Sequence, residues 1–323
     1  MVRNATNQVL QKAKKYKSDE FYTQLCDIER ELQYYKNCFK GKTVYCNCDN
    51  PRTSNFFRYF ADNFHKLGLK KVIASCYVPT ENDLFQQHES KSGLYCEYTG
   101  TGNINEIEVK PFIGDGDFRS NESVSLLKQA DIVVTNPPFS LFREFVSQLV
   151  RYDKDFLVIG NVNAITYKEI FDLIQQNKVW LGVNLGRGIS GFIVPDNYEL
   201  YGTEVSVNEE GKHIIATNNC LWLTNLENSQ RHENINLTKI YKDNEDKYPA
   251  YDNCVGINVN RTQDIPKDYQ GLMGVPITFL HKYNPAQFEI VRFRKGDDGK
   301  DLRIKGKCPY FRILIKNRRV GVL

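Results

Sequence analysis

Residues 131–139 read DIVVTNPPF, an apolar run that ends in an asparagine and two prolines. The β-branched residues Ile132–Thr135 are typical of a buried strand. Proline donates no backbone hydrogen bond and keeps the chain extended, so Pro137 and Pro138 end the strand and leave carbonyl groups outside the ladder. The following residues 140–152, SLFREFVSQLVRY, have helical apolar spacing. The stretch therefore predicts a strand, a turn and a helix in succession.

The same alternation of strand and helix extends on both sides of this stretch. Further apolar runs predict strands at 42–48, 70–77 and 155–163, and residues 109–118 predict a third strand that runs into a turn. Apolar spacing and capping residues predict helices at 19–38, 53–68, 121–130 and 166–177. The polar, glycine-containing residues 80–110 are expected to form an insertion or a hairpin. Strands of this kind, alternating with helices, indicate an α/β fold with a parallel sheet covered on both faces.

Beyond residue 180 the apolar runs become shorter and β-like, as in GFIVP, NNCLWLTNL, PITFL, FEIVRF and YFRILIK. CLWLTN (220–225) remains compatible with a late strand of the first sheet. We therefore predict a first domain over residues 1–226 and a β-rich second domain over 227–323. This division agrees with a length of 323 residues, because one domain typically has about 150.

Composition favours a globular intracellular protein. Hydrophobic residues make up 41% and charged residues 25% of the chain. No apolar run approaches the ~20 residues of a membrane span, and the basic N-terminus lacks the apolar core of a signal peptide. The nine cysteines are an odd number without paired metal-ligand spacing. We expect reduced cysteines in a cytoplasm and no metal, although a structural metal site remains an alternative.

The net charge of +4 is unevenly distributed along the chain. Residues 1–17 carry five Lys/Arg and no acid, residues 292–323 carry eleven Lys/Arg against three acids, and the remainder therefore sums to −9. Basic ends on an acidic body suggest a polyanionic partner, with solvated tails as the alternative. If the partner is DNA, the candidate contact residues are Lys12, Lys14, Lys15, Arg292 and Arg294.

Chemically suggestive segments stand at the carboxyl ends of the predicted strands, where ligands gather in such sheets. The Asn136 side chain and the Pro137 carbonyl can accept both hydrogens of an exocyclic amino group, and Phe139 can stack on its ring. Accepting both hydrogens frees the lone pair of the amino nitrogen for nucleophilic attack. Asp117 can accept from the amino group of an adenine, and Phe118 can cover that ring. A plain proline turn and a simple acidic turn are the structural alternatives.

Ten segments, read together, resemble the EcoRI DNA adenine methyltransferase family over nearly the whole chain. They are SDEFYTQ (18–24), VYCNCDNPRTSNFF (44–57), GDGDFRS (114–120), DIVVTNPPFSLF (131–142), WLGVNLGRG (180–188), GFIVP (191–195), YELYGTE (198–204), NNCLWLTNL (218–226), MGVPITFLHKYNP (273–285) and KCPYFRILIKN (307–317). The resemblance implies a Rossmann-like class I methyltransferase sheet that uses S-adenosylmethionine, with a C-terminal target-recognition region. It also implies a site-specific enzyme that methylates N6 of a flipped-out adenine in duplex DNA.

The resemblance also assigns roles to individual residues. Asn136, Pro137, Pro138 and Phe139 match the catalytic tetrapeptide. The cofactor-binding matches are Asp117 and Phe118 at its adenine, Tyr22 and Thr23 at its methionine end, and Asn47 and Asp49 in the first-strand segment. The glycines usual in that segment are missing, and Cys76-Tyr77 stand where the family pattern has an acid after the second strand.

The family further implies the target GAATTC with its second adenine modified, a monomer on DNA, a bacterial cytoplasmic, nucleoid-associated location, and a cognate restriction endonuclease without stable contact. One rival interpretation is a methyltransferase that acts on RNA adenine or on a protein glutamine, because these targets need the same acceptors for their amino or amide hydrogens. The other is a catalytically inactive DNA-binding relative. The basic C-terminal part favours nucleic acid, and the intact NPPF favours activity.

Overall fold

The computed structural model of the protein describes residues 22–78, 92–184, 189–194, 205–208, 211–216, 219–299 and 301–318. Contacts divide the chain into two units. Unit 1 comprises Met1–Ile170 and Gly182–Leu226, and unit 2 comprises Phe171–Leu181 and Glu227–Leu323. Within the described residues, no helix has the length and apolar character needed to cross a membrane.

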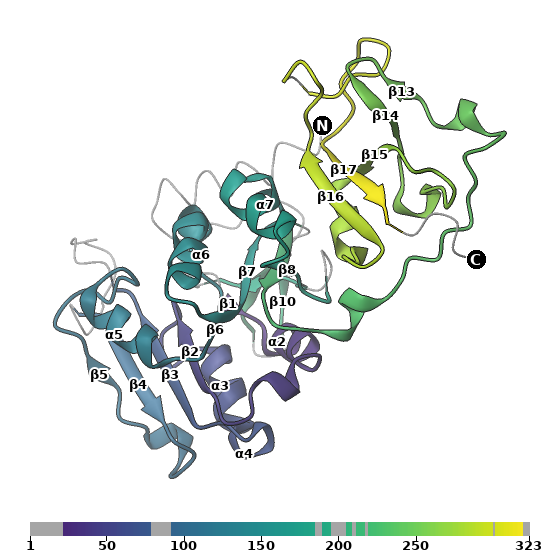
Figure 1. Cartoon of the computed structure of the whole chain (residues 1–323). Coiled ribbons are helices and arrows are strands. Elements are labelled where there is room, and N and C mark those ends of the chain that lie inside the picture. Colours follow the sequence, from purple (N-terminus) through teal and green to yellow (C-terminus); the bar gives the residue numbers. More distant parts are fainter. Residues whose placement is uncertain are drawn as a thin grey trace. The chain divides into compact units, whose positions relative to one another are not determined.

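The large sheet of unit 1 has the strand order β5-β4-β3-β2-β6-β7-β12 (Figure 1). Its strands are β2 (Thr43–Asn47), β3 (Lys71–Cys76), β4 (Leu94–Tyr98), β5 (Lys110–Pro111), β6 (Ile132–Thr135), β7 (Asp155–Asn161) and β12 (Cys220–Thr224). The central strands β3, β2, β6 and β7 are parallel to one another, which confirms the prediction from their apolar runs. β12 adds antiparallel to β7, so CLWLTN is indeed a late strand of this sheet.

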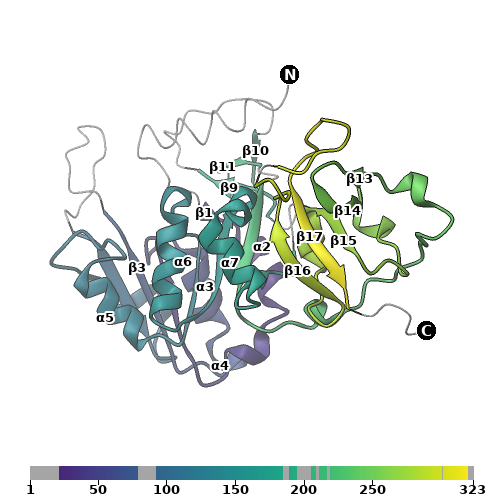
Figure 2. The ribbon, with the colours of Figure 1, turned by 45° about the horizontal axis from the view of Figure 1, so that its top comes forward.

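Both faces of the parallel strands are buried. Val44 and Cys46 of β2 pack in one apolar cluster with side chains of α2 and α3, whereas the intervening Tyr45 points to the other face and is 1% exposed. Figures 1 and 2 show α5 and α6 over the face opposite α3. The helices of unit 1 are α2 (Leu25–Leu32), α3 (Asn55–Asp62), α4 (Phe64–Leu67), α5 (Asn121–Gln129) and α6 (Phe142–Arg151), and its short 3₁₀ turns are Lys36–Cys38, Ile104–Glu106, Phe139–Leu141 and Val162–Thr166.

The helix that follows β2 shows why the sequence folds in this way. Ser54 caps α3 by accepting a hydrogen bond from the Phe57 amide at 3.3 Å. Gly68 ends α4 with a left-handed φ of +64°, a conformation that favours glycine. The predicted helix at 53–68 is therefore present as α3 and α4, broken only at Asn63.

The strand that was predicted to run into a turn at 109–118 is present but much shorter than expected. Only Lys110–Pro111 is extended, as β5, and β5 pairs with β4 rather than with the parallel strands. The place beside β3 is taken by β4, which lies antiparallel to it. Beyond β5, the Gly114 and Asp115 carbonyls accept from the amides of Gly93 and Val78, next to the ends of β4 and β3. The amides of Ile113 and Gly114 donate to the Glu122 carboxylate of α5 rather than to a strand. The segment GDGD is consequently a loop beside the sheet.

A second, small sheet lies in unit 1 and is entirely antiparallel, with the order β1-β9-β11-β10. Its strands are β1 (Tyr22–Thr23), β9 (Phe192–Ile193), β10 (Val205–Val207) and β11 (His213–Ile215). This sheet joins the start of the described chain to residues about 170 positions later. Thr23 pairs with Phe192 in it.

Unit 2 is built on a five-stranded sheet with the order β13-β14-β15-β17-β16 (Figure 2). Its strands are β13 (Ala250–Tyr251), β14 (Cys254–Asn258), β15 (Leu272–Pro276), β16 (Phe288–Phe293) and β17 (Arg312–Asn317). It also holds β8 (Trp180–Leu181), most of α7 (Lys168–Gln175), and 3₁₀ turns at Ser229–His232, Glu245–Lys247, Thr262–Asp264 and Ile277–Lys282. The β-like runs FEIVRF and YFRILIK are strands as predicted, whereas PITFL forms the last of these turns.

Candidate functional site

The NPPF tetrapeptide lies at the carboxyl end of β6, directly beside the end of β2. β2 and β6 run parallel, and the Thr135 hydroxyl donates a hydrogen bond to the Asn47 carbonyl, which ties the two strand ends together. Asn136 follows and is 8% exposed. Its side chain is therefore held near the first-strand segment, at the sheet edge where parallel α/β sheets bind ligands.

Phe139 connects this tetrapeptide to the small sheet. Its ring meets that of Phe192 edge-on, with centroids 6.1 Å apart. Phe192 in turn pairs with Thr23, which belongs to the predicted cofactor segment. Thr23 is also anchored from the first-strand side, because Asn55 at the start of α3 donates its side-chain amide to the Thr23 carbonyl at 2.9 Å. The structure thus brings three segments that are distant in sequence to one place.

Two buried polar atoms at this place lack a hydrogen-bond partner among the described residues: the Thr23 hydroxyl and the Asn47 side-chain oxygen. The two residues are 1% and 4% exposed. A buried polar group without a partner costs about 1–3 kcal/mol. A polar ligand that reached both atoms would remove this cost, so the pair fits a bound cofactor.

The turn after β2 has an unusual backbone at Cys48, where φ is +84°. A left-handed φ disfavours any residue except glycine. The next residue, Asp49, is 7% exposed and accepts a hydrogen bond from the Ser54 hydroxyl at 3.2 Å. Burial raises the pKa of the Cys48 thiol, and the negative charges of Asp49 and Asp117 raise it further. Cys48 therefore lies within electrostatic range of both predicted cofactor-binding acids.

The GDGD loop is held against the end of β3 by backbone contacts. Val78 donates to the Asp115 carbonyl at 2.8 Å, and Gly93 donates to the Gly114 carbonyl at 3.0 Å. Gly116 has φ +79°, and a Cβ there would lie 2.3 Å from the carbonyl oxygen of Cys76. Only glycine permits this close approach, which sets the position of the residue that follows, Asp117.

Asp117 already has a strong partner. Arg119 donates to its carboxylate from the backbone amide, from Nε and from Nη2, at 2.6–2.8 Å. The side-chain hydrogen bond from Arg119 is the main cause that lowers the pKa of Asp117, so the carboxylate is ionised at neutral pH. A carboxylate offers about four acceptor positions. Three donors leave room for one more, which is what an adenine amino group would need.

Phe118 is 8% exposed and packs edge-on against Phe145, with ring centroids 5.2 Å apart. The Arg119 guanidinium carbon lies 5.3 Å from the centroid of the Phe118 ring. Gln148 of α6 donates to the Phe118 carbonyl at 3.0 Å. These contacts fix the residue beside Asp117.

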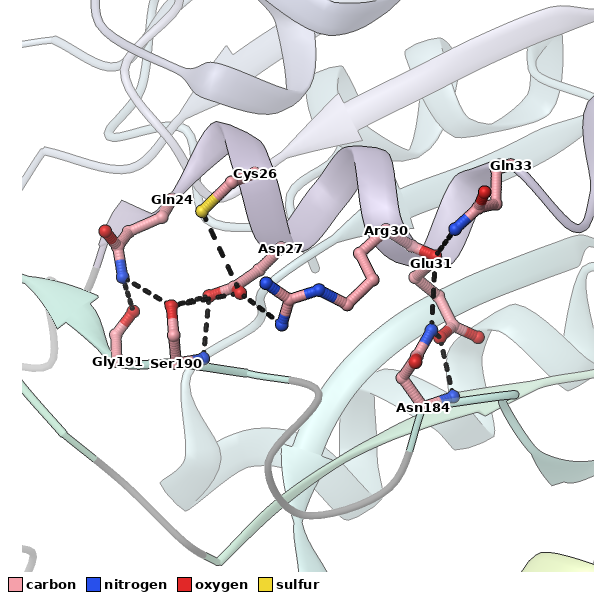
Figure 3. Close-up of polar contacts among 9 residues, drawn as sticks. All are labelled: Gln24, Cys26, Asp27, Arg30, Glu31, Gln33, Asn184, Ser190 and Gly191. Atoms are coloured by element: carbon pink, nitrogen blue, oxygen red, sulfur yellow. Dashed lines mark hydrogen bonds and ion pairs between the residues drawn. The ribbon is translucent and has the colours of Figure 1, made fainter.

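Sequence reasoning missed two buried carboxylates of α2, Asp27 and Glu31, both 0% exposed (Figure 3). Asp27 accepts from the Ser190 amide and hydroxyl at 2.9–3.0 Å. Glu31 accepts from the amides of Val183 and Asn184 at 2.7 and 2.9 Å. Burial raises the pKa of both carboxyls, and the hydrogen bonds from Ser190 and Asn184 oppose that shift.

These bonds attach α2 to the segment that leads into β9. Gln24 reinforces the attachment, because its side-chain amide donates to the Ser190 hydroxyl at 2.8 Å and to the Gly191 carbonyl at 3.1 Å (Figure 3). Gln24 directly follows Thr23. The α2 carboxylates therefore support the pairing of β1 with β9 that positions Thr23.

The predicted DNA-contact residues belong to other segments of the chain. Arg292 and Arg294 belong to unit 2, at the end of β16. Lys12, Lys14 and Lys15 lie outside the described residues. All nine cysteines fall within the described ranges as thiols rather than disulfides, and no group of three or more His, Cys, Asp or Glu side chains suited to a metal occurs there.

Known proteins resemble this chain along nearly its whole length. The family model described as adenine-specific methyltransferase EcoRI matches residues 9–318. The type II methyltransferase M.EcoRI of Escherichia coli is 64% identical over 99% of each chain. M.MgeORF184P of Mycoplasma genitalium and M.MpnI of Mycoplasma pneumoniae, both type II methyltransferases, are each 38% identical over 96% and 95% of this chain and 98% of their own. No solved structure matches the chain.

Proposed function

The chain belongs to the EcoRI family of adenine-specific DNA methyltransferases, and we propose that it transfers a methyl group from S-adenosylmethionine to N6 of adenine in duplex DNA. The relative's name and the sequence resemblance support GAATTC as the target, with the second adenine modified. The observation that carries the proposal is the buried Asn136 at the end of β6, beside the unsatisfied polar atoms of Thr23 and Asn47.

The reaction requires acceptors for the amino hydrogens rather than a protein nucleophile. S-adenosylmethionine supplies a methyl group that its positive sulfur has already activated. The Asn136 side-chain oxygen and the Pro137 carbonyl accept the two N6 hydrogens, which lets the nitrogen become tetrahedral and frees its lone pair. Phe139 stacks on the adenine and keeps the nitrogen aligned. Alignment and preorganised acceptors act mainly in the transition state.

The cofactor is held by residues from three segments of unit 1. Asp117 accepts from its adenine amino group through the acceptor position that Arg119 leaves open. Phe118 lies beside that ring. Tyr22 and Thr23 close over the methionine end, where the buried Thr23 hydroxyl gains a partner. Asn47 and Asp49, at the end of β2, bind the polar groups between the two ends.

Catalysis and target recognition are assigned to different parts of the chain. We assign residues 1–226 to a Rossmann-like catalytic domain and residues 227–323 to target recognition. An adenine inside a duplex is reached only after it is flipped out, which costs a few kcal/mol. Phosphate contacts offset this cost, and Lys12, Lys14, Lys15, Arg292 and Arg294 are the candidates. The enzyme acts as a monomer on the DNA of a bacterial nucleoid, and any cognate restriction endonuclease acts without stable contact.

The proposal is tested by single-turnover methylation of a GAATTC duplex by Asn136→Ala. Loss of a transition-state acceptor commonly costs ~10²–10³ in rate, whereas cofactor binding by calorimetry should remain near that of the wild type. Ser147→Ala, on the outer part of α6, serves as the control and should keep the wild-type rate. RNA and peptide substrates of the same target chemistry should remain unmodified. A rate for Asn136→Ala within a few-fold of the wild type would remove Asn136 from the reaction.

A further inference from the structure

Unit 2 presents two large aromatic side chains at its surface, immediately before β17. Tyr310 is 73% and Phe311 is 47% exposed. Arg294, from the end of β16, places its guanidinium carbon 4.2 Å from the centroid of the Phe311 ring. We call Phe293, Arg294, Tyr310 and Phe311 the aromatic edge. Neighbouring exposed apolar side chains can mark an interaction site, and Arg294 lies within cation–π range of the Phe311 ring.

The aromatic edge rests on a continuous stack of rings. Phe171 packs against Phe293 with centroids 5.0 Å apart, and Phe293 lies 6.1 Å from Phe311. Phe171 is 4% exposed, so the stack leads from the interior of unit 2 to its surface. Since each ring supports the next, Phe311 is held in a defined orientation.

A buried arginine fixes the backbone of the two exposed residues. Arg312 is 7% exposed and donates from Nη1 to the carbonyls of Tyr310 and Phe311 at 3.2 and 3.4 Å. Its other nitrogens donate to the side chains of Asn258 and Asn260 at 2.9 and 3.2 Å. Arg312 thus joins the exposed segment to the sheet. A preorganised surface residue loses little conformational entropy on binding.

The stretch of sequence that carries the aromatic edge is basic, although Arg294 itself pairs with Asp301 at 3.7 Å. Over residues 288–318 the sequence has ten Lys/Arg and four Asp/Glu. Arg292, Lys307 and Lys316 are among the exposed cations. This charge fits a polyanion and disfavours a purely apolar protein partner. Aromatic rings among cations bind nucleic acids by stacking on bases while the cations contact phosphates.

We propose that the aromatic edge contacts duplex DNA, with Tyr310 and Phe311 stacking on bases at a step that the enzyme opens. The inference rests on the proposed function, because it needs DNA as the substrate. A stacking role and the phosphate contact assigned to Arg292 differ in how DNA affinity depends on salt. A stacking contact adds affinity without releasing counterions, whereas a phosphate contact contributes about 0.9 to the salt slope.

The test measures DNA affinity against salt concentration for the full chain. Tyr310→Ser and Phe311→Leu should each lower affinity about tenfold at every salt concentration and leave the slope unchanged. Phe311→Leu keeps an apolar side chain against Phe293 but removes the aromatic face, so folding is preserved. Arg292→Gln should instead flatten the slope by about 0.9. Val255→Ser, which changes an apolar side chain of unit 2 that is 86% exposed, is the matched control and should change neither quantity.

A second readout reports the opened step directly. 2-Aminopurine, placed in turn at positions other than the target adenine, should brighten on wild-type binding at the opened step and brighten less with Tyr310→Ser or Phe311→Leu. Wild-type affinity in both variants, or a flattened slope in both, would overturn the stacking role. Failure of the wild-type chain to bind DNA would instead contradict the proposed function itself.

Discussion

Gly116→Ala tests how the GDGD loop is held at the end of β3. A Cβ at this position, where φ is +79°, would lie 2.3 Å from the Cys76 oxygen and 3.1 Å from the Cα of Gly93. A left-handed φ costs a non-glycine residue about 1–2 kcal/mol. The overlap involves backbone atoms, which no rotamer change relieves, and overpacking of this kind adds about 1–3 kcal/mol. We therefore expect a loss of about 2–5 kcal/mol in the free energy of unfolding.

Gly102→Ala is the matched control, because Gly102 has φ +84° but no described atom within 4 Å of its added Cβ. It should lose only the backbone contribution of about 1–2 kcal/mol. Urea denaturation of both variants measures the difference. Gly116→Ala should also raise the Kd for S-adenosylmethionine, since Asp117 follows it. Equal losses of stability in the two variants, with unchanged cofactor binding, would refute the close approach.

Further predictions concern charge, hydrogen bonding and the N-terminal lysines. Arg119 lowers the pKa of Asp117 in the folded protein, so the wild type should be more stable than Arg119→Gln above the unfolded carboxyl pKa of about 3.9. This advantage should be lost as the pH falls through the lower folded pKa of Asp117. Urea denaturation across that pH range measures the difference in the free energy of unfolding. Asp117→Ala should weaken S-adenosylmethionine binding and leave DNA affinity nearly intact, and calorimetry that finds an unchanged cofactor Kd would exclude Asp117 from the site. Thr23→Val removes a buried hydroxyl without changing the size of the side chain, so cofactor affinity should fall about two- to tenfold while the free energy of unfolding is kept or raised. Affinity against salt should show a flatter slope for all DNA sequences, by about 0.9 per lost contact, when glutamine replaces the basic residues Lys12, Lys14 and Lys15; an unchanged slope would mean that these lysines remain solvated.

Periodicity and composition predicted the central sheet because its strands are buried on both faces. Four apolar runs became the parallel strands β2, β3, β6 and β7. The strand at 109–118 is shorter than predicted for a physical reason: the carbonyls of Gly114 and Asp115 accept from Gly93 and Val78, next to the ends of β4 and β3, rather than from a neighbouring strand. A short apolar run does not reveal which backbone partner it will find.

The supporting residues of the site were harder to predict. Asp27 and Glu31 are four positions apart and adjacent to the apolar residues Ile28 and Leu32, which was the available signal that α2 buries carboxylates. Their partners lie more than 150 residues away, so no local pattern identified them. The positive φ of Cys48 was equally hidden, because a cysteine stands where glycine is the residue that the backbone favours.

The most direct test of the account is to map methylated bases in DNA from a bacterial host that lacks other adenine methylation and expresses this chain. We expect N6-methyladenine at the second adenine of GAATTC on both strands, and none when the host expresses Asn136→Ala. Methylation that persists with Asn136→Ala, or DNA that carries no N6-methyladenine with the wild-type chain, would contradict the central claim.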